Sequence, residues 1–282
     1  MTSNKINSMK YVFFLGIIAV TWSCNDSTEI KKKTWELVWQ DDFNTILADS
    51  LPNSANWKFD IGKGPNNDGW GNAEWQTYTN NTNNIKLDKI DGEGFLKISA
   101  RQEGSNYTSA RIKTMGLIEQ KYGRFEARIK LPYGPGIWPA FWMLGANIET
   151  TAWPACGEID IMEYKGQEPD KIHGTLHGPV LYGGNAITQT YSLTNARFDT
   201  DFHLFAVEWD ENAIDFFADQ VLYKRISKQE VVSKGGNWVY DQPFFLIFNL
   251  AVCGNFVGTT VAGTVFPQTM LVDYVKVYRE LK

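Results

Sequence analysis

This sequence of 282 residues has few cysteines and few histidines, and its basic residues do not outnumber its acidic ones. Its three cysteines, Cys24, Cys156 and Cys253, are too few for a disulfide scaffold, and neither they nor the three histidines have the spacing of a zinc site. With 27 Lys and Arg against 32 Asp and Glu, the net charge of -5 argues against a broad basic surface for nucleic acid or anionic lipid. The composition therefore favours a neutral partner.

No apolar run is long enough to span a membrane. The N-terminal run, residues 11–20, follows two lysines and falls well short of the roughly 20 residues that a transmembrane helix needs. A basic start before a short apolar run is typical of a secretory signal peptide, which we expect over residues 1–23. Ser23 directly before Cys24 resembles the lipobox of bacterial lipoproteins, although Thr21 replaces the usual leucine, and we expect a lipid on Cys24.

Residues 24–34 are polar and contain three consecutive lysines. We interpret them as a tether between the lipid and a folded domain, residues 35–282. The combination predicts an exported monomer displayed on a bacterial envelope, with the lipid as its membrane contact. If Cys24 carries no lipid, the same signal predicts a secreted protein.

Short runs of alternating apolar and polar residues dominate the chain from Trp35 onward. Period-two runs with a turn about every ten residues predict one all-β domain, an antiparallel sandwich or barrel. The run 123–131 has one apolar and one charged face, so we expect its charged face in water. The other clear runs lie at residues 95–100, 202–209 and 213–218, with a turn at 210–212 and one short helix near 227–233.

Aromatic residues make up 14% of the chain, more than an ordinary core requires, and several lie beside polar side chains. In the segment 70–78, interpreted as a strand, Asn72, Glu74, Gln76 and Tyr78 share one face. A row of hydrogen-bonding groups beside tryptophans suits sugar hydroxyls, but a solvated edge strand has the same pattern.

Three acidic residues, Glu158, Asp160 and Glu163, lie within six positions of one another. On a helix, Asp160 and Glu163 would point about 200° and 140° away from Glu158, so no helical face gathers the three. On a strand, Glu158 and Asp160 share a face, and Glu163 joins them only if one extra residue is inserted. We therefore expect a β-bulge at residues 161–162, a feature common beside active sites.

Three carboxylates on one face repel one another, so the pKa of at least one must rise or a cation must bind. A retaining glycosidase needs this difference in pKa, because one carboxylate attacks as a nucleophile while the other, protonated, acts as an acid. The apolar flanks of the segment argue against a solvated acidic face, and the scarcity of histidines in register argues against a metal site. The pattern favours two-carboxylate chemistry.

Aromatic side chains and histidines flank the acidic segment. Trp138 and Trp142 fall on one strand face with the small Ala140 between them, which leaves a slot where a pyranose ring could stack. His173 and His177 also share a strand face and could donate to a hydroxyl or hold a carboxylate. Taken alone, the tryptophans could equally be core residues and either histidine could be structural.

Together these segments resemble glycoside hydrolase family 16, in particular its laminarinase-like bacterial members. The resemblance extends over residues 35–278 and implies a β-jelly-roll sandwich of two curved antiparallel sheets, whose concave face forms a cleft for a β-glucan. It rests on four motifs in order along the chain, at residues 70–78, 138–144, 157–163 and 273–278.

The same resemblance implies a role for each matched residue. It also implies that catalysis needs no cofactor. Glu158 would be the nucleophile, Glu163 the acid/base, and Asp160 the residue that keeps the charge and protonation of the nucleophile in order. Asp273 matches a residue that often contributes to a structural calcium site, although an ordinary exposed strand acid fits it nearly as well. The positions that match sugar-binding residues are Asn72, Glu74, Arg111, Trp138, Trp142, His177 and Phe256.

The sequence departs from the family at two neighbouring positions. Cys253 stands where the family commonly has glycine, and Phe256 stands where tryptophan is frequent, which preserves an aromatic cleft wall. Cys253 and Cys156 could form a bridge or remain two free thiols.

The function favoured by these residues is retaining endo-hydrolysis of β-1,3-glucan. The extra Met162 in the acidic motif is absent from lichenase-like members of the family, which disfavours a strict mixed-linkage enzyme, and the acidic chain offers no basic cleft for sulfated galactans. The alternatives are a hydrolase of mixed-linkage glucan, agar or carrageenan, a carbohydrate-binding protein without catalysis, and a cation-binding envelope module. The matched carboxylates argue against binding alone.

Overall fold

The computed structural model describes residues 33–44 and 50–282, and residues 34–282 form one compact unit. The predicted signal peptide (residues 1–23), the lipid site at Cys24 and nearly all of the predicted tether (residues 24–34) lie outside the described residues. Within the described part of the chain, no helix has the length and apolar character that crossing a membrane requires.

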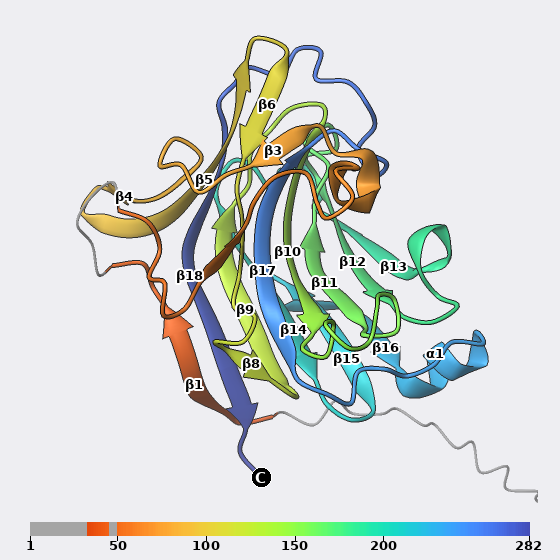
Figure 1. Ribbon diagram of the computed structural model, residues 1–282. Coiled ribbons are helices and arrows are strands. Elements are labelled where there is room, and N and C mark those ends of the chain that lie inside the picture. The colour runs from red at the N-terminus through yellow and green to blue at the C-terminus, as the bar shows by residue number, and fades with distance from the viewer. Residues whose placement is uncertain (1–32, 45–49) are drawn as a thin grey trace, which may run out of the picture. The chain divides into compact units, whose positions relative to one another are not determined.

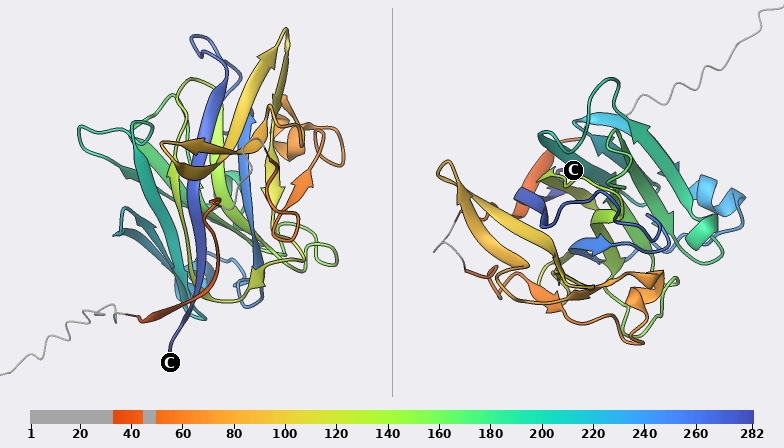
Figure 2. Two further views of the ribbon diagram at one scale, coloured as in Figure 1. Left: turned by 90° about the vertical axis from the view of Figure 1, so that its left-hand side faces the viewer. Right: turned by 90° about the horizontal axis from the view of Figure 1, so that it is seen from above.

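Two sheets make up this unit (Figure 1), and among the described strands only β3 and β6 pair in parallel. The ten-stranded sheet runs in the order β16 (Val221–Ser227), β15 (Ala213–Ala218), β14 (Phe202–Trp209), β9 (Gly123–Lys130), β18 (Gln268–Glu280), β5 (Glu93–Glu103), β6 (Asn106–Ser109) and β3 (Gln76–Tyr78), with β1 (Trp35–Asp41) beside β18 and β4 (Ile85–Ile90) beside β5. The eight-stranded sheet runs in the order β13 (Ile187–Ser192), β12 (Lys171–His177), β11 (Glu158–Glu163), β10 (Ile137–Gly145), β17 (Phe244–Val252), β7 (Arg111–Lys113) and β2 (Lys58–Asp60), with β8 (Glu119–Gln120) beside β17. The all-β sandwich of two curved sheets is confirmed (Figure 2).

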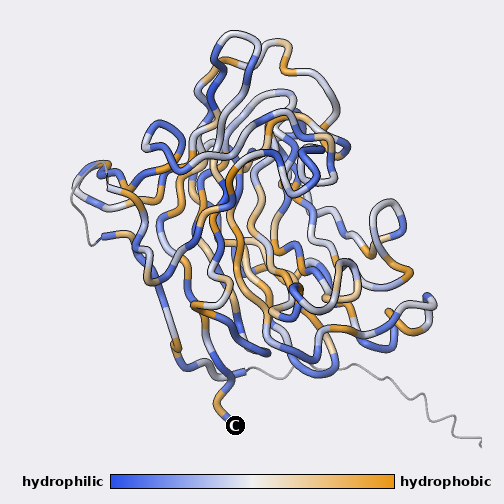
Figure 3. Tube along the Cα trace, viewed as in Figure 1, coloured by the Kyte–Doolittle hydropathy of each residue, from blue (hydrophilic) through white to orange (hydrophobic). Residues whose placement is uncertain are grey.

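The two sheets pack around one apolar core. Phe125 of β9, Phe141 of β10 and Phe248 of β17 are buried in it, and the rings of Phe141 and Phe248 stack with their centroids 4.7 Å apart. In Figure 3 hydrophobic residues follow the central strands, and hydrophilic residues concentrate in the connecting loops. Because full burial of such a side chain contributes roughly 1.5–3 kcal/mol, the sheets are held together mainly by this core.

Several of the predicted elements are confirmed at their boundaries. The runs 202–209 and 213–218 are β14 and β15, and in the turn between them the Asp210 N–H donates to the Ala213 carbonyl. The predicted helix is α1 (Lys228–Ser233), which begins after Ser227 because the Ser227 hydroxyl accepts from the Glu230 N–H at 3.0 Å.

The alternation in β9 predicted that its charged face lies in water, and this is only partly so: Arg128 and Lys130 are partly exposed, whereas Glu126 is buried. Glu126 is buried and accepts hydrogen bonds from Arg124 at 2.8 Å and from the Tyr278 hydroxyl at 3.1 Å. Arg124 also pairs with Glu208 of the neighbouring strand at 2.8 Å. Arg124 and Glu126 are therefore paired within the protein, as charges removed from water need to be.

The segment 70–78 is not one strand. Residues Gly69–Ala73 form a short irregular helical turn, in which Trp70 and Gly71 have positive φ, and only β3 is extended. A Cβ added at Gly69 would lie 2.4 Å from the Glu74 backbone nitrogen, so glycine is required where the chain folds back on itself.

Cys156 and Cys253 are two free, buried thiols. Cys253 follows β17 beside Gly136, whereas Cys156 lies beside Gly145 at the other end of the nine-residue strand β10. A strand of that length spans roughly 30 Å, far more than the roughly 7 Å between Cα atoms that a disulfide allows. Cys253 has φ +58°, a left-handed conformation that glycine adopts more easily than other residues.

Candidate active site

Strand β11 presents its three acids on one face through the predicted bulge. Asp160 pairs with Thr175 of β12 and Glu163 with His173, so β11 advances three residues where β12 advances two. The residues between the acids, Ile159, Ile161 and Met162, are fully buried. The bulge therefore turns Glu163 to the same side as Asp160, as the spacing predicted.

Strand β10 adds its own side chains to this face. Trp142 pairs with Asp160 and Ala140 with Glu163, and directly paired residues of antiparallel strands share a face. The predicted arrangement of two tryptophans with a small residue between them is therefore confirmed beside the acids. The Trp138 indole N–H donates to Glu163 Oε1 at 3.2 Å.

His177 of β12 lies against the other two acids. Its Nε2 is 3.2 Å from Asp160 Oδ2 and 3.7 Å from Glu158 Oε1. Its Nδ1 accepts from the Gly183 N–H at 3.2 Å, which places the proton of a neutral ring on Nε2, facing the carboxyl groups. His177 therefore presents a donor to the cluster.

Burial raises the pKa of all three carboxyl groups. The pKa of Glu158 rises to about 8 through burial and the charge of Asp160, and that of Asp160 rises well above its usual range through burial and the charge of Glu163. The pKa of Glu163 rises to about 7, mainly through burial, with His177 opposing the rise and Glu158 adding to it. The cluster therefore titrates as a unit and keeps protons near neutral pH.

We expect these raised pKa values to make stability fall with pH. Glu163 has a pKa near 4.5 in the unfolded chain and about 7 in the folded protein, so the folded state binds its proton more tightly. The resulting stabilisation is complete below pH 4.5 and is lost as the pH rises through about 7. Glu163→Gln mimics the protonated form, and its melting temperature should match that of the wild type at pH 5 and exceed it by several degrees at pH 8. Thermal denaturation measures this difference, with Glu168→Gln as a control at a partly exposed ion pair with Lys171. If the melting temperatures of Glu163→Gln and the wild type differed by the same amount at pH 5 and pH 8, the raised pKa of Glu163 would be contradicted.

The predicted polar row forms a buried hydrogen-bonded network although it is not a strand. Glu74 accepts hydrogen bonds from Asn72 at 3.2 Å, from Gln76 at 2.6 Å and from the Tyr78 hydroxyl at 3.0 Å. Gln76 and Tyr78 are fully buried, so the interpretation as a solvated edge strand is wrong. Asn249 extends the network by donating to the Tyr78 hydroxyl at 3.2 Å.

This network reaches the acids through Trp142, whose indole N–H donates to Asn249 Oδ1 at 2.7 Å. Arg111 lies between two indoles, 4.5 Å from the ring centre of Trp70 and 4.7 Å from that of Trp142. The Nε of Arg111 forms an ion pair with Asp60 Oδ2 at 2.9 Å. Arg111 and Trp70 also line a pocket of about 480 Å³, whose lining includes Leu144, the strand partner of Glu158, but none of the three acids.

Phe256 and His173 lie on the β12 side of Glu163. The Phe256 ring is 5.1 Å from that of Trp138 and meets His173 edge-on at 5.3 Å. Burial and the charge of Lys165 lower the pKa of His173 to about 4, so this ring is neutral, and its Nδ1 is 3.0 Å from the Thr190 hydroxyl. The aromatic wall predicted at Phe256 is therefore in contact with Trp138.

Asp273 lies in β18 of the ten-stranded sheet, whereas the acid cluster lies in the eight-stranded one. Its Oδ2 accepts from Arg128 at 2.7 Å. In the described part of the chain, a group of three or more acidic, histidine or cysteine ligands occurs only at Glu158, Asp160 and His177. Among the described residues, no such group includes Asp273, and a calcium site there remains a prediction.

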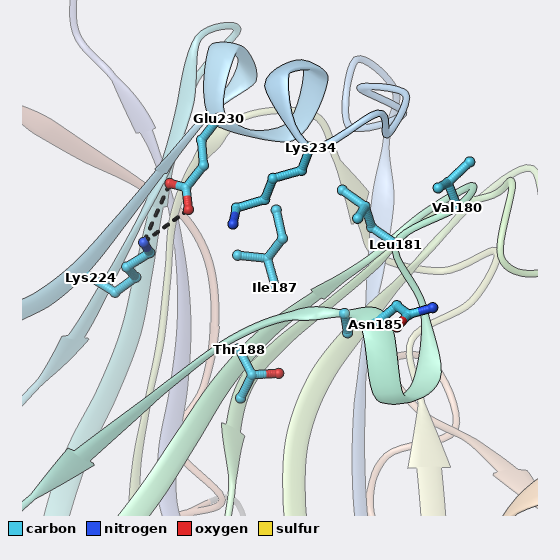
Figure 4. Close-up of a pocket in the computed structure, with 9 residues that line it drawn as sticks. Val180, Leu181, Asn185, Ile187, Thr188, Lys224, Glu230 and Lys234 are labelled. Atoms are coloured by element: carbon cyan, nitrogen blue, oxygen red, sulfur yellow. Dashed lines mark hydrogen bonds and ion pairs between the residues drawn. The ribbon is translucent and has the colours of Figure 1, made fainter.

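A second pocket, of about 580 Å³, lies between β13, the residues before it and α1 (Figure 4). Lys224 and Glu230 form an ion pair at 3.1 Å on its wall. It shares no lining residue with the acid cluster, and no role is assigned to it.

Sequence reasoning missed three contributors to the site. Trp153 lies in the apolar flank that precedes the acidic segment, and its indole N–H donates to Glu158 Oε2 at 2.8 Å. Asn249 and Asp60 each hold a predicted sugar-binding side chain, Trp142 and Arg111. Both partners are far away in the sequence, so their contacts depend on strand order, which local patterns do not encode.

Comparison with known proteins decides the family. The profile described as "Glycosyl hydrolases family 16" matches residues 66–265. The chain belongs to this family. A Rhodothermus marinus protein named beta-glucanase is 39% identical to it over 276 residues, which are 95% of this chain and 93% of that protein.

Solved family 16 structures have the same fold. The endo-β-1,3-glucanase from Pyrococcus furiosus has a TM-score of 0.82 at 44% identity, covering 90% of this chain and 98% of that one. The laminarinase catalytic domain from Thermotoga maritima has a TM-score of 0.80 at 43% identity, covering 88% of this chain and 99% of that one. The jelly-roll architecture expected from the motifs is therefore confirmed, and the chain is a glycoside hydrolase of family 16.

Proposed function

We propose that this protein cleaves internal β-1,3 bonds of a glucan with retention of anomeric configuration. The observation that carries the proposal is the bulged strand β11, which brings Glu158, Asp160 and Glu163 to one face beside indole and imidazole donors. Relatives that align over most of the chain are named for action on β-glucans, which supports this substrate class.

Each carboxyl group has one role in the proposed double displacement. The reactive form is the one in which the coupled cluster holds its protons on Glu163 and Asp160 and leaves Glu158 ionised. Ionised Glu158 then attacks C1 of the sugar while Glu163 gives its proton to the departing glycosidic oxygen. Glu163, now ionised, takes a proton from water as that water attacks C1, and the C1–Glu158 bond breaks to restore the carboxylate. Asp160, whose pKa is raised most clearly by burial, holds a proton beside Glu158 and so limits the negative charge of the cluster.

We assign sugar binding to the groups on either side of the acids. Trp70, Arg111 and Trp142 lie together and offer aromatic faces for a pyranose ring. The partly exposed Asn72 supplies a hydrogen-bonding group, and the buried Glu74 accepts from Asn72 and so orients it. On the β12 side, we assign the departing part of the polymer to the wall formed by Trp138 and Phe256 and hydroxyl contacts to His177. These surfaces bind an uncharged polysaccharide and do not require a basic cleft.

Product analysis tests the substrate assignment. The mature protein is incubated with laminarin, lichenan, agarose and carrageenan, and the products are separated by size. We expect a ladder of short oligosaccharides from laminarin. Preferential cleavage of agarose, carrageenan or lichenan would move the protein to the corresponding alternative, and binding of laminarin without products would indicate a carbohydrate-binding protein.

We also propose that the protein is a lipoprotein, exported and anchored through Cys24. Two acyl chains contribute roughly 0.8 kcal/mol for each buried CH₂, far more than a polar tether can. Wild-type protein should partition with membranes, and Cys24→Ala should be soluble or remain an unprocessed precursor. Fractionation and mass spectrometry of the N-terminus measure this. Wild-type protein found entirely in the medium with an unmodified N-terminus would establish plain secretion instead.

A further inference from the structure

Trp153 has an unusual position for an exposed aromatic residue. About 42% of its surface is accessible, yet its indole N–H donates to Glu158 Oε2 at 2.8 Å. His177 Nε2 is 3.7 Å from the other oxygen of Glu158 and lies closer to Asp160. Of the described residues, Trp153 therefore supplies the short N–H hydrogen bond to Glu158.

The loop between β12 and β13 holds this indole in place. Tyr182 meets the Trp153 ring edge-on at 5.4 Å, and the ring of His177 is 6.0 Å away. The next residue, Gly183, donates its N–H to His177 Nδ1. The same loop therefore orients two of the groups that face Glu158.

We propose that Trp153 is a positioning residue for the nucleophile, held by Tyr182, and that its N–H stabilises the ionised carboxylate of Glu158. The inference rests on the proposed role of Glu158. A carboxylate attacks only when ionised, and an N–H bond to the charged form favours ionisation. When the bond from C1 to Glu158 breaks in the second step, its electron pair returns to the carboxylate, and the same N–H stabilises that charge.

The pKa of Glu158 agrees with this geometry. Burial and Asp160 raise it, while the hydrogen bond from Trp153 acts in the opposite direction. Loss of that bond should therefore raise the pKa of Glu158 further and leave fewer molecules with an ionised nucleophile at a given pH.

The variant that isolates this bond is Trp153→Phe, which keeps an aromatic ring against Tyr182 but removes the N–H. We expect kcat on laminarin at pH 6 to fall about 10- to 100-fold, the range for a hydrogen bond to a charged group. We expect KM to change less than about threefold, because the bond is to the enzyme's own carboxylate. The acidic limb of the kcat/KM profile should move to higher pH.

Trp238→Phe is the matched control, because it removes an indole N–H bond of 3.0 Å to Asp241, a carboxylate outside the acid cluster. It should leave kcat and the pH profile unchanged. An increase in KM for Trp153→Phe with kcat and the acidic limb unmoved would overturn the proposal and make Trp153 a sugar-stacking residue.

A measurement without substrate separates this inference from the proposed function. Carbon-13 NMR of glutamate carboxyl groups, with the Glu158 signal assigned by its loss in Glu158→Gln, follows the titration of Glu158 directly. Trp153→Phe should raise that pKa relative to the wild type and to Trp238→Phe, whether or not laminarin is the substrate. An unchanged pKa would overturn the inference even in an active laminarinase.

Discussion

Glu158→Gln should abolish hydrolysis of laminarin, with a loss of kcat on the order of 10⁴-fold or more. The amide has the shape of the carboxyl group but cannot attack C1, so the first displacement does not occur. Glu163→Gln should lose about 10²- to 10⁴-fold, the contribution of a positioned acid/base. Both substitutions remove a partly buried carboxyl group from a cluster of like charges, so we expect them to leave the fold intact.

The two roles are distinguished by how each variant is rescued. Glu163→Gln should regain the first step on aryl glycosides whose leaving group needs no proton, and the glycosyl-enzyme should then accumulate. Glu158→Ala leaves space for azide, which should attack C1 directly and give a product of inverted configuration. Glu168→Gln changes a partly exposed acid that pairs with Lys171 and should retain wild-type turnover. Near wild-type activity in either catalytic variant would refute the assignment.

Deletion of Met162 should inactivate the enzyme. The bulge gives β11 one residue more than its neighbours between Asp160 and Glu163, and a strand reverses the direction of its side chains at every residue. Without the extra residue, Glu163 turns toward the core or the chain beyond it changes register. We expect a loss of activity comparable to that of Glu163→Gln, measured as kcat on laminarin.

Met162→Leu is the control for this deletion, because it keeps the residue count and about the same buried volume. It should retain most of the activity. A deletion variant with a regular strand and full activity would show that the bulge does not align the acids.

The chemistry of β11 could be predicted from local sequence, because the spacing of its acids is compatible with one shared face only on a bulged strand. The path of residues 70–78 could not, since the turn at Gly69 depends on close contact with the Glu74 backbone. Burial of Glu126 depends on Tyr278, which is 152 residues away. Alternation in one strand indicates which residues share a face but not what covers that face.

Contacts made by loops were the least predictable part of the site. Trp153 precedes β11 by only a few residues, yet its bond to Glu158 requires the loop to fold back over the strand and Tyr182 to pack against the indole. Neither follows from an alternating pattern. The glycine-like conformation of Cys253 was similarly visible only as a departure from the family.

The stereochemistry of hydrolysis tests the central claim most directly. Proton NMR spectra recorded during the first minutes of laminarin cleavage show which anomer forms before mutarotation mixes the two. Because Glu158 attacks C1 and water then displaces it, two inversions restore the original configuration, and we predict that the β-anomer appears first. If the α-anomer appeared first, a single displacement would be at work and Glu158 could not be the nucleophile.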